Sequence, residues 1–134
     1  MKRAIAMLAT LFLATGCLSS FLSSGHVIEM VMPLAPPDGR AAQELALVEI
    51  LGEVAQEMGM RVDDPIRVYG RVAYTAKYGN GAISGFSMGV AVSDHISIDF
   101  RSLEDVPTTT AERAFALFKQ RMDQLGLKYA VRRV

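Results

Sequence analysis

The stretch Phe86 to Phe100, FSMGVAVSDHISIDF, contains two runs in which large apolar residues alternate with small or polar ones. Such alternation is typical of strands that bury one face and leave the other face open. A three-residue loop, Ser93-Asp94-His95, keeps both apolar sets on one face, because successive side chains of a strand point to opposite sides. The stretch therefore predicts an antiparallel hairpin whose inward residues are Phe86, Met88, Val90, Val92, Ile96, Ile98 and Phe100.

A further alternating run, Ile66 to Tyr78, precedes this hairpin and predicts a third strand. A two-residue turn at Asn80-Gly81 would place its apolar residues and those of the next strand, Ile83 to Val92, on opposite faces. A three-residue loop, Gly79 to Gly81, places both sets on one face and favours a glycine in the left-handed conformation. The predicted core rows are Val72–Met88–Phe100, Gly70–Val90–Ile98 and Val68–Val92–Ile96.

Two helices are predicted outside these three strands, at Arg40 to Met58 and at Thr109 to Leu125. Asp38 is the predicted N-cap of the first, and Thr109 and Glu112 have the spacing of a capping box in the second. A glycine follows each helix and suits the left-handed residue that ends it. The apolar stripes expected to be buried are Ala41, Leu45, Leu47, Val48, Leu51, Val54, Ala55 and Met58 in the first helix, and Ala111, Ala114, Phe115, Phe118, Met122 and Leu125 in the second.

Two outer strands complete the pattern, at Val27 to Leu34 and at Leu127 to Val134. Pro33 cannot donate a hydrogen bond to a neighbour, so the first of them lies at an edge or ends there. The order is then β-α-β-β-β-α-β. We expect an α+β fold with one mostly antiparallel sheet of four to five strands and both helices packed on one face. This single domain spans residues 26–134.

The first residues have the pattern of a targeting segment. Lys2 and Arg3 are followed by an uncharged apolar run, Ala4 to Leu13, which is shorter than the roughly 20 residues needed to span a bilayer. Next comes Leu13-Ala14-Thr15-Gly16-Cys17, which holds the chain's single cysteine. This segment resembles the lipobox of bacterial lipoproteins, although Ala14 stands where leucine is more usual.

The resemblance implies that residues 1–16 are a signal peptide that is removed and that Cys17 carries a diacylglyceryl group, with a further acyl chain such as palmitate on its amine. Residues 17–25 would then be the lipidated cysteine and a short tether, which reaches roughly 28 Å at about 3.5 Å per residue. Leu18, in place of the aspartate that favours inner-membrane retention, favours the outer membrane, facing the periplasm. The alternative is ordinary secretion with Cys17 as an unpaired thiol.

The composition narrows the possible functions. The chain has 14 basic and 14 acidic residues, which argues against a bulk nucleic-acid binder. A single cysteine leaves no disulfide within the domain, so the core must hold it. The only histidines, His26 and His95, stand in no repeated ligand motif, so we expect no metal and no cofactor.

The predicted register also places a set of polar and small residues on the sheet face away from the helices. Gly89 and its neighbours make the middle strand nearly bare, and basic residues flank it. We interpret this face as a shallow trough with cationic walls, suited to an anionic chain, a lipid head group or an extended segment of a partner. The alternative is a solvated face on which Arg71 and Asp99 pair across Gly89. The candidate binding residues are Arg67, Tyr69, Arg71, Ser87, Gly89, Asp99, Arg101, Lys128 and Arg132.

His95, Ser97 and Asp99 do not have the geometry of a catalytic triad. A relay needs the histidine between the nucleophile and the carboxylate. Along a strand, His95 and Asp99 lie about 13 Å apart, at roughly 3.3 Å per residue. We therefore expect a non-catalytic accessory or scaffold subunit of a cell-envelope assembly, held to the membrane by its lipid and bound to a protein partner. The alternative is a module that binds an anionic lipid or glycan, and an enzyme is the last choice.

Overall fold

The computed structural model of the chain describes residues 26–78, 85–102 and 108–133. The signal-peptide and tether predictions, including Cys17, lie outside these residues, as does the predicted turn at Asn80-Gly81. The elements are β1 (His26–Pro33), η1 (Pro37–Gly39), α2 (Arg40–Met58), β2 (Met60–Val62), β3 (Ile66–Val68), β4 (Arg71–Tyr78), β5 (Phe86–Val92), β6 (His95–Ser102), α3 (Thr108–Gln124) and β7 (Ala130–Arg133). No helix in the described ranges is long and apolar enough to cross a membrane.

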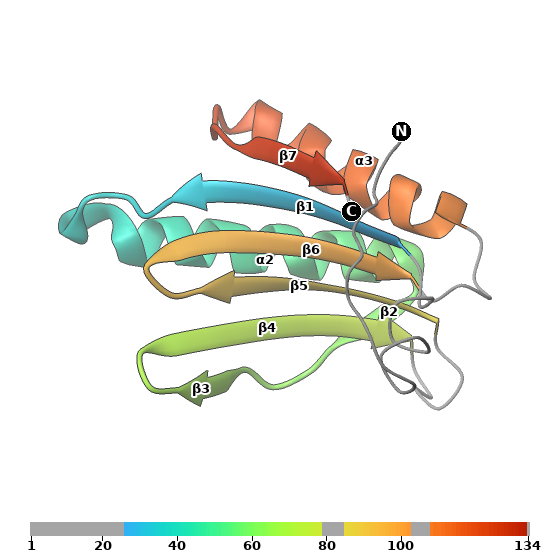
Figure 1. The fold of residues 1–134 in the computed structure, drawn as a ribbon, viewed down its shortest axis with the longest axis horizontal. Helices are drawn as coiled ribbons and strands as arrows, with labels where there is room; N and C mark the ends of the chain where they lie inside the picture. Colours follow the sequence, from blue (N-terminus) through green and yellow to red (C-terminus); the bar gives the residue numbers. More distant parts are fainter. Residues whose placement is uncertain (1–25, 79–84, 103–107, 134) are drawn as a thin grey trace, which may run out of the picture.

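The strands form one antiparallel sheet, and the two helices lie behind it in the view of Figure 1. The strand order is β2-β4-β5-β6-β1-β7, and β3 also pairs with β4. The α+β prediction is confirmed, but the expected four to five strands were too few, because the described sheet has seven. β1 lies between β6 and β7, so Pro33 ends a strand rather than marking an edge.

The core lies between the sheet and the helices. Phe100 of β6 sits against two phenylalanines of α3, with ring centroids 5.8 Å from Phe115 and 5.6 Å from Phe118 in edge-to-face geometry. Such pairs contribute about 0.5–1.5 kcal/mol beyond the burial of their area. At the surface, Arg121 of α3 ties the helices together through Glu53 at 3.0 Å and Glu57 at 2.8 Å on α2. The middle strands of the sheet, β1, β4, β5 and β6, turn their large apolar residues toward the helix layer.

The predicted register is right for one strand pair and wrong for the other. β5 and β6 pair Met88 with Phe100 and Val90 with Ile98, as predicted. On β4, however, Tyr74 pairs with Val90 rather than with Phe86, so β4 is displaced by four residues along β5. The inward face is unchanged, because an even displacement preserves the alternation. The observed core rows are Ala76–Met88–Phe100, Tyr74–Val90–Ile98 and Val72–Val92–Ile96.

The cause is a turn inside the predicted strand Ile66 to Tyr78. Tyr69 and Gly70 both have positive φ, 47° and 78°, and reverse the chain so that β3 folds back along β4. Two successive left-handed residues match the right-handed twist of a two-residue hairpin, and glycine adopts this conformation without strain. Gly70 and Val68 therefore leave the predicted core rows, and Tyr74 and Ala76 occupy them.

The edge of the sheet beyond β4 contains a bulge. The Asp63 amide donates to the Thr75 carbonyl, which continues the register of β2, yet Ile66 pairs with Ala73. One extra residue therefore stands on the edge, and a one-residue slip moves side chains to the other face of the sheet. Met60 of β2 faces the helices and is buried, whereas Ile66 and Val68 of β3 face away from them and are exposed.

The helix boundaries agree closely with the prediction, but the N-cap of α2, the first residue of α3 and three stripe positions differ. α2 spans Arg40–Met58 as predicted, yet Asp38 is not its N-cap, because it belongs to the 3-10 turn η1 and Gly39 takes the cap position. α3 begins at Thr108, one residue before the predicted Thr109. Three expected stripe residues are exposed, Ala41, Leu45 at 58% and Leu125 at 57%, because they lie beyond the area that the sheet and the other helix cover.

Candidate functional site

The face of the sheet away from the helices, here called the open face, is built from alternate residues of the strands. Its polar and small side chains stand between the inward residues of the same strands. On the four middle strands it consists of Val27, Glu29, Val31 and Pro33 of β1, Arg71, Ala73, Thr75 and Lys77 of β4, Ser87, Gly89 and Ala91 of β5, and His95, Ser97, Asp99 and Arg101 of β6.

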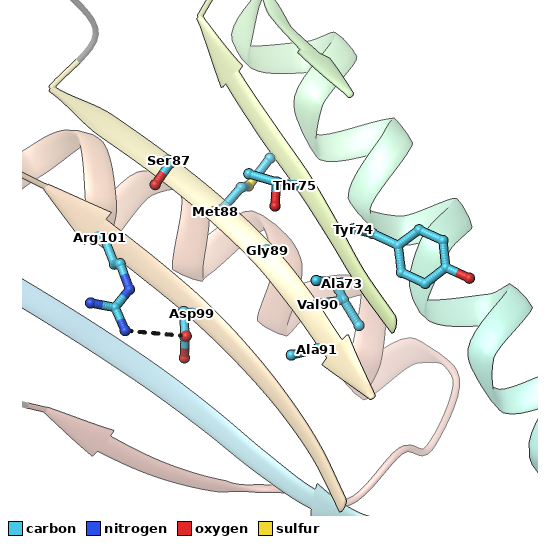
Figure 2. A pocket seen from close by; sticks show the side chains of 10 residues that line it. All are labelled: Ala73, Tyr74, Thr75, Ser87, Met88, Gly89, Val90, Ala91, Asp99 and Arg101. Carbon is cyan, nitrogen blue, oxygen red and sulfur yellow. Dashed lines mark ion pairs between the residues drawn. The ribbon is translucent and has the colours of Figure 1, made fainter. Parts of the chain in front are cut away.

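A hollow lies at the centre of the open face, over Gly89, and is called the Gly89 hollow below. Figure 2 shows Gly89 on β5 between Thr75 of β4 and Asp99 of β6, which are its two cross-strand partners. The hollow has a volume of about 160 Å³ and is also lined by Ala73, Ala91, Ser87 and Arg101. A Cβ atom at Gly89 would stand 3.0 Å from the Tyr74 carbonyl oxygen and would partly fill the space. The lack of a side chain therefore opens the hollow.

Two carboxylates face each other beside the hollow. Glu29 of β1 and Asp99 of β6 are direct cross-strand partners, an arrangement that is unfavourable for two like charges. Arg132 of β7 donates from Nε to Glu29 at 2.9 Å, and the guanidinium of Arg101 lies 3.6 Å from Asp99. Each carboxylate thus has an arginine at its side, which offsets the repulsion between them.

The hydroxyl of Ser97 lies between the same two carboxylates. Its oxygen is 2.8 Å from Glu29 Oε2 and 3.0 Å from Asp99 Oδ1, and its one proton can serve only one of them at a time. Partial burial raises the pKa of Glu29, but hydrogen bonds from Ser97 and Arg132 outweigh that effect and hold the pKa below its usual range. Glu29 is therefore ionised at neutral pH.

The basic residue of β4 beside the hollow is also paired. Lys77 lies 3.2 Å from Asp63, the residue that follows β2, and Arg61 of β2 lies 3.1 Å from the same carboxylate. The hydrogen bond from Arg61 is the largest of the effects that lower the pKa of Asp63. Beside the Gly89 hollow, the walls predicted to be cationic are therefore made of ion pairs, whereas Arg71, farther along β4, forms none in the described ranges.

The structure brings together only some of the nine candidate residues. Ser87, Gly89, Asp99 and Arg101 line the hollow, and Arg132 reaches Glu29 beside it. The other four residues, Arg67, Tyr69, Arg71 and Lys128, do not line it.

Each of these four has a different position. Arg67 pairs with Val72 on β4, so it lies on the helix side of β3, and Tyr69 is in the hairpin turn. Arg71 is opposite Val68 rather than level with Asp99, so the predicted pairing across Gly89 is wrong. Lys128 is exposed and precedes β7.

Sequence reasoning did not identify Glu29 as the centre of this network. The signal that could have found it is the alternation of Ile28, Met30 and Met32, which places Glu29 on the face away from the helices. The missing information was the strand order, because β1 and β6 are neighbours in the sheet although they are far apart in the sequence. Without that neighbour, neither the contact with Asp99 nor that with Ser97 could be assigned.

His95, Ser97 and Asp99 do not form a relay in the structure. The imidazole Nδ1 of His95 lies 2.8 Å from Asp94, in the turn before β6, while the hydroxyl of Ser97 lies against carboxylates. Among the described residues, no group of three or more histidine, cysteine, aspartate or glutamate side chains is arranged to hold a metal ion. No protein-family model and no curated protein matches this chain.

Proposed function

We propose that the chain is a lipid-anchored lipoprotein of the bacterial envelope that acts without catalysis, as an accessory or scaffold subunit that binds a protein partner on its open face. Cys17 would carry the lipid, in the outer membrane and facing the periplasm. The observation that carries the proposal is the Gly89 hollow, set in a sheet face that no other described element covers. Both helices cover the opposite face of the same strands.

The size and lining of the hollow suit one side chain of a partner. Its volume of about 160 Å³ is comparable with the cavity of about 150 Å³ that accepts a benzene ring. Ala73 and Ala91 supply apolar walls, and Thr75 and Ser87 offer hydroxyl groups. Protein interfaces commonly have this composition, with one anchoring side chain in a pocket and polar groups at the rim.

The paired charges favour a protein over a simple anion. An anionic ligand would have to compete with Asp99 for Arg101 and with Glu29 for Arg132. A protein surface of mixed charge can instead meet the ion pairs without breaking them, because opposite signs alternate on both sides. Binding of an anionic lipid or glycan is therefore the alternative that the experiment must separate.

Photocrosslinking in intact cells tests the proposal. A photoreactive residue replaces Ser87, at the rim of the hollow, and the matched control carries the same residue at Glu49, which is exposed on α2. We expect one dominant protein adduct at position 87 that is weak at position 49. Ala91→Phe, which fills the hollow without touching the helix face, should remove that adduct. A lipid or glycan adduct, or equal labelling at both positions, would contradict the proposal.

The anchor has a separate test. Mass spectrometry of the N-terminal peptide from the membrane fraction should find Cys17 at the terminus with its acyl chains. A free thiol at Cys17, or a chain that still begins at Met1, would contradict the lipid anchor and leave the open face as a separate question.

A further inference from the structure

The end of the β3–β4 hairpin differs from the rest of the surface in its exposed apolar side chains. Ile66 is 63% exposed, Val68 is 50% exposed and Tyr69 is completely exposed. The three lie within four consecutive residues, and Arg67 and Arg71 stand on either side of Tyr69. This group of five residues is called the hairpin tip below.

Tyr69 occupies a position that is unfavourable for a tyrosine. Its φ of 47° is left-handed, a conformation that asparagine, aspartate and glycine tolerate much better at a hairpin turn. Its ring is fully in contact with water and packs on no part of the described chain. A bulky residue in this conformation at an exposed turn points to a functional contact, because the turn itself does not need a tyrosine.

The two arginines of the tip are not neutralised as the other basic residues of this sheet are. Neither Arg67 nor Arg71 forms an ion pair within the described ranges, in contrast to Arg101 and Arg132 of the open face. Arg67 interacts with the hydroxyl of Tyr74, where it opposes the larger effect of Glu44, which raises the pKa of that phenol.

Glu44 lines the same hollow as Arg67 and Arg71. Glu44 accepts a hydrogen bond from Tyr74, and Asp94, in the turn before β6, is bound to His95. The tip therefore presents apolar side chains together with two arginines that form no ion pair in the described ranges.

This combination fits the interfacial region of an anionic membrane. Tyrosine is enriched where lipid head groups meet the acyl chains, because its ring is apolar and its hydroxyl is polar. Arginines beside such a ring are attracted to anionic lipids and can keep their charged ends among the head groups. We propose that the hairpin tip inserts into the surface of an anionic bilayer and gives the domain a second membrane contact besides its lipid.

The geometry of the chain permits this contact with the same membrane that holds Cys17, and here the inference rests on the proposed lipid anchor. His26, where the described chain begins, and the tip lie at opposite ends of the strands, which are eight residues or about 26 Å long in β1. Residues 18–25 reach roughly 28 Å when extended. The tip projects slightly past the end of β1, so the tether lets it reach the bilayer when the strands tilt toward the membrane plane. Tethering also raises the local concentration of lipid around the tip.

The chain offers a direct probe, because it contains no tryptophan. Tyr69→Trp places a single fluorophore at the tip, and Leu125→Trp places the control in an exposed apolar position past the end of α3, ahead of the opposite edge strand. The full chain, purified with its lipid, is reconstituted into vesicles of phosphatidylethanolamine and phosphatidylglycerol whose acyl chains carry bromine. We expect the emission of the Tyr69→Trp variant to shift to shorter wavelength and to be strongly quenched by bromine, with neither effect in the Leu125→Trp variant.

The arginines are tested in the Tyr69→Trp background, with Cys17→Ser chains that are produced without residues 1–16, carry no acyl group and are added to preformed vesicles. Arg67→Ser and Arg71→Ser should each lower the partition coefficient about fivefold at low salt. Vesicles of phosphatidylcholine alone should bind weakly.

Water-like emission of the Tyr69→Trp variant, with no more quenching than the Leu125→Trp variant shows, would overturn the inference. Protection of the fluorophore at position 69 only when another protein is added would overturn it as well. Because the Cys17→Ser chains need no anchor, this readout stands even if Cys17 proves to be unmodified in cells.

Discussion

The two faces of the sheet are made from alternate residues of the same strands, yet they are built for different purposes. On β6, Phe100 turns toward the helices and packs edge-to-face on two aromatic rings, while its neighbours Asp99 and Arg101 pair with each other on the open face. Large apolar side chains and full burial characterise one side, and small residues with paired charges characterise the other. The difference teaches that two substitutions one residue apart can have very different effects on stability.

The largest expected effect falls on the helix face. Phe100→Ala should lower the free energy of unfolding by about 3–5 kcal/mol, because it leaves a cavity between the sheet and α3. The neighbouring Arg101→Ala, on the open face, should change it by less than about 1 kcal/mol, since its ion pair is largely exposed to water. Urea unfolding of the two variants measures this contrast. Similar losses of stability in both variants would contradict the claim that the helix face, and not the open face, stabilises the fold.

A smaller loss is expected from the hydroxyl between the two carboxylates. Ser97→Ala should cost roughly 1–2 kcal/mol, because Glu29 and Asp99 would face each other with one fewer donor. Ser87→Ala, on the same face but away from the two carboxylates, is the control and should be nearly neutral. Chemical denaturation of both variants decides the matter, and a neutral Ser97→Ala would show that the arginines alone suffice.

The same network predicts how stability depends on pH. The pKa of Glu29 is lower in the folded chain than in the unfolded chain, where it is about 4.3. Its contribution to stability is therefore complete above the unfolded value and is lost as the pH falls through the folded value. In Glu29→Gln, the free energy of unfolding, measured between neutral and acidic pH, should therefore fall less steeply as the pH is lowered. An unchanged pH profile in that variant would assign the acid sensitivity to other carboxylates.

The smallest effect is expected at the hairpin tip, and it has the opposite sign. Tyr69→Asn should raise the free energy of unfolding by about 0.5–1 kcal/mol, because asparagine tolerates the left-handed backbone at the turn. Tyr129→Asn, outside this turn, offers no such relief and loses the hydrogen bond from Tyr129 to Asp123. Thermal unfolding can resolve the difference, and destabilisation by Tyr69→Asn would show that the ring packs on the domain after all.

The sequence predicted correctly those features that depend on neighbouring residues alone. The alternation from Phe86 to Phe100 gave both the strands and their register, because a short loop joined them and parity fixed the faces. The glycines predicted to end the two helices in the left-handed conformation do so, with φ of 74° at Gly59 and 71° at Gly126. These features depend on local geometry, which the order of residues along the chain contains.

The remainder depended on an unexpected local turn and on contacts between distant parts of the chain. The turn at Tyr69-Gly70 interrupts an alternating run that predicted one continuous strand. The alternation continues on both sides of the turn, so the pattern gave no sign of it. The bulge after Asp63 turned Ile66 and Val68 outward, which alternation alone cannot foresee. The ion pairs that neutralise the open face required the positions of β1 and β7 beside β6, so the predicted cationic trough became a neutralised surface with a hollow.

The central claim is that the Gly89 hollow is covered by a partner in the cell, and thiol labelling tests it most directly. The chain's only cysteine is Cys17, so Ser87→Cys and Glu49→Cys each introduce one new reactive thiol, at the rim of the hollow and on the exposed side of α2. With Cys17 acylated, we predict that a maleimide labels position 87 about tenfold more slowly in intact cells than in the purified protein, while position 49 reacts equally in both. Equal labelling of position 87 in cells and in the purified protein would contradict the account.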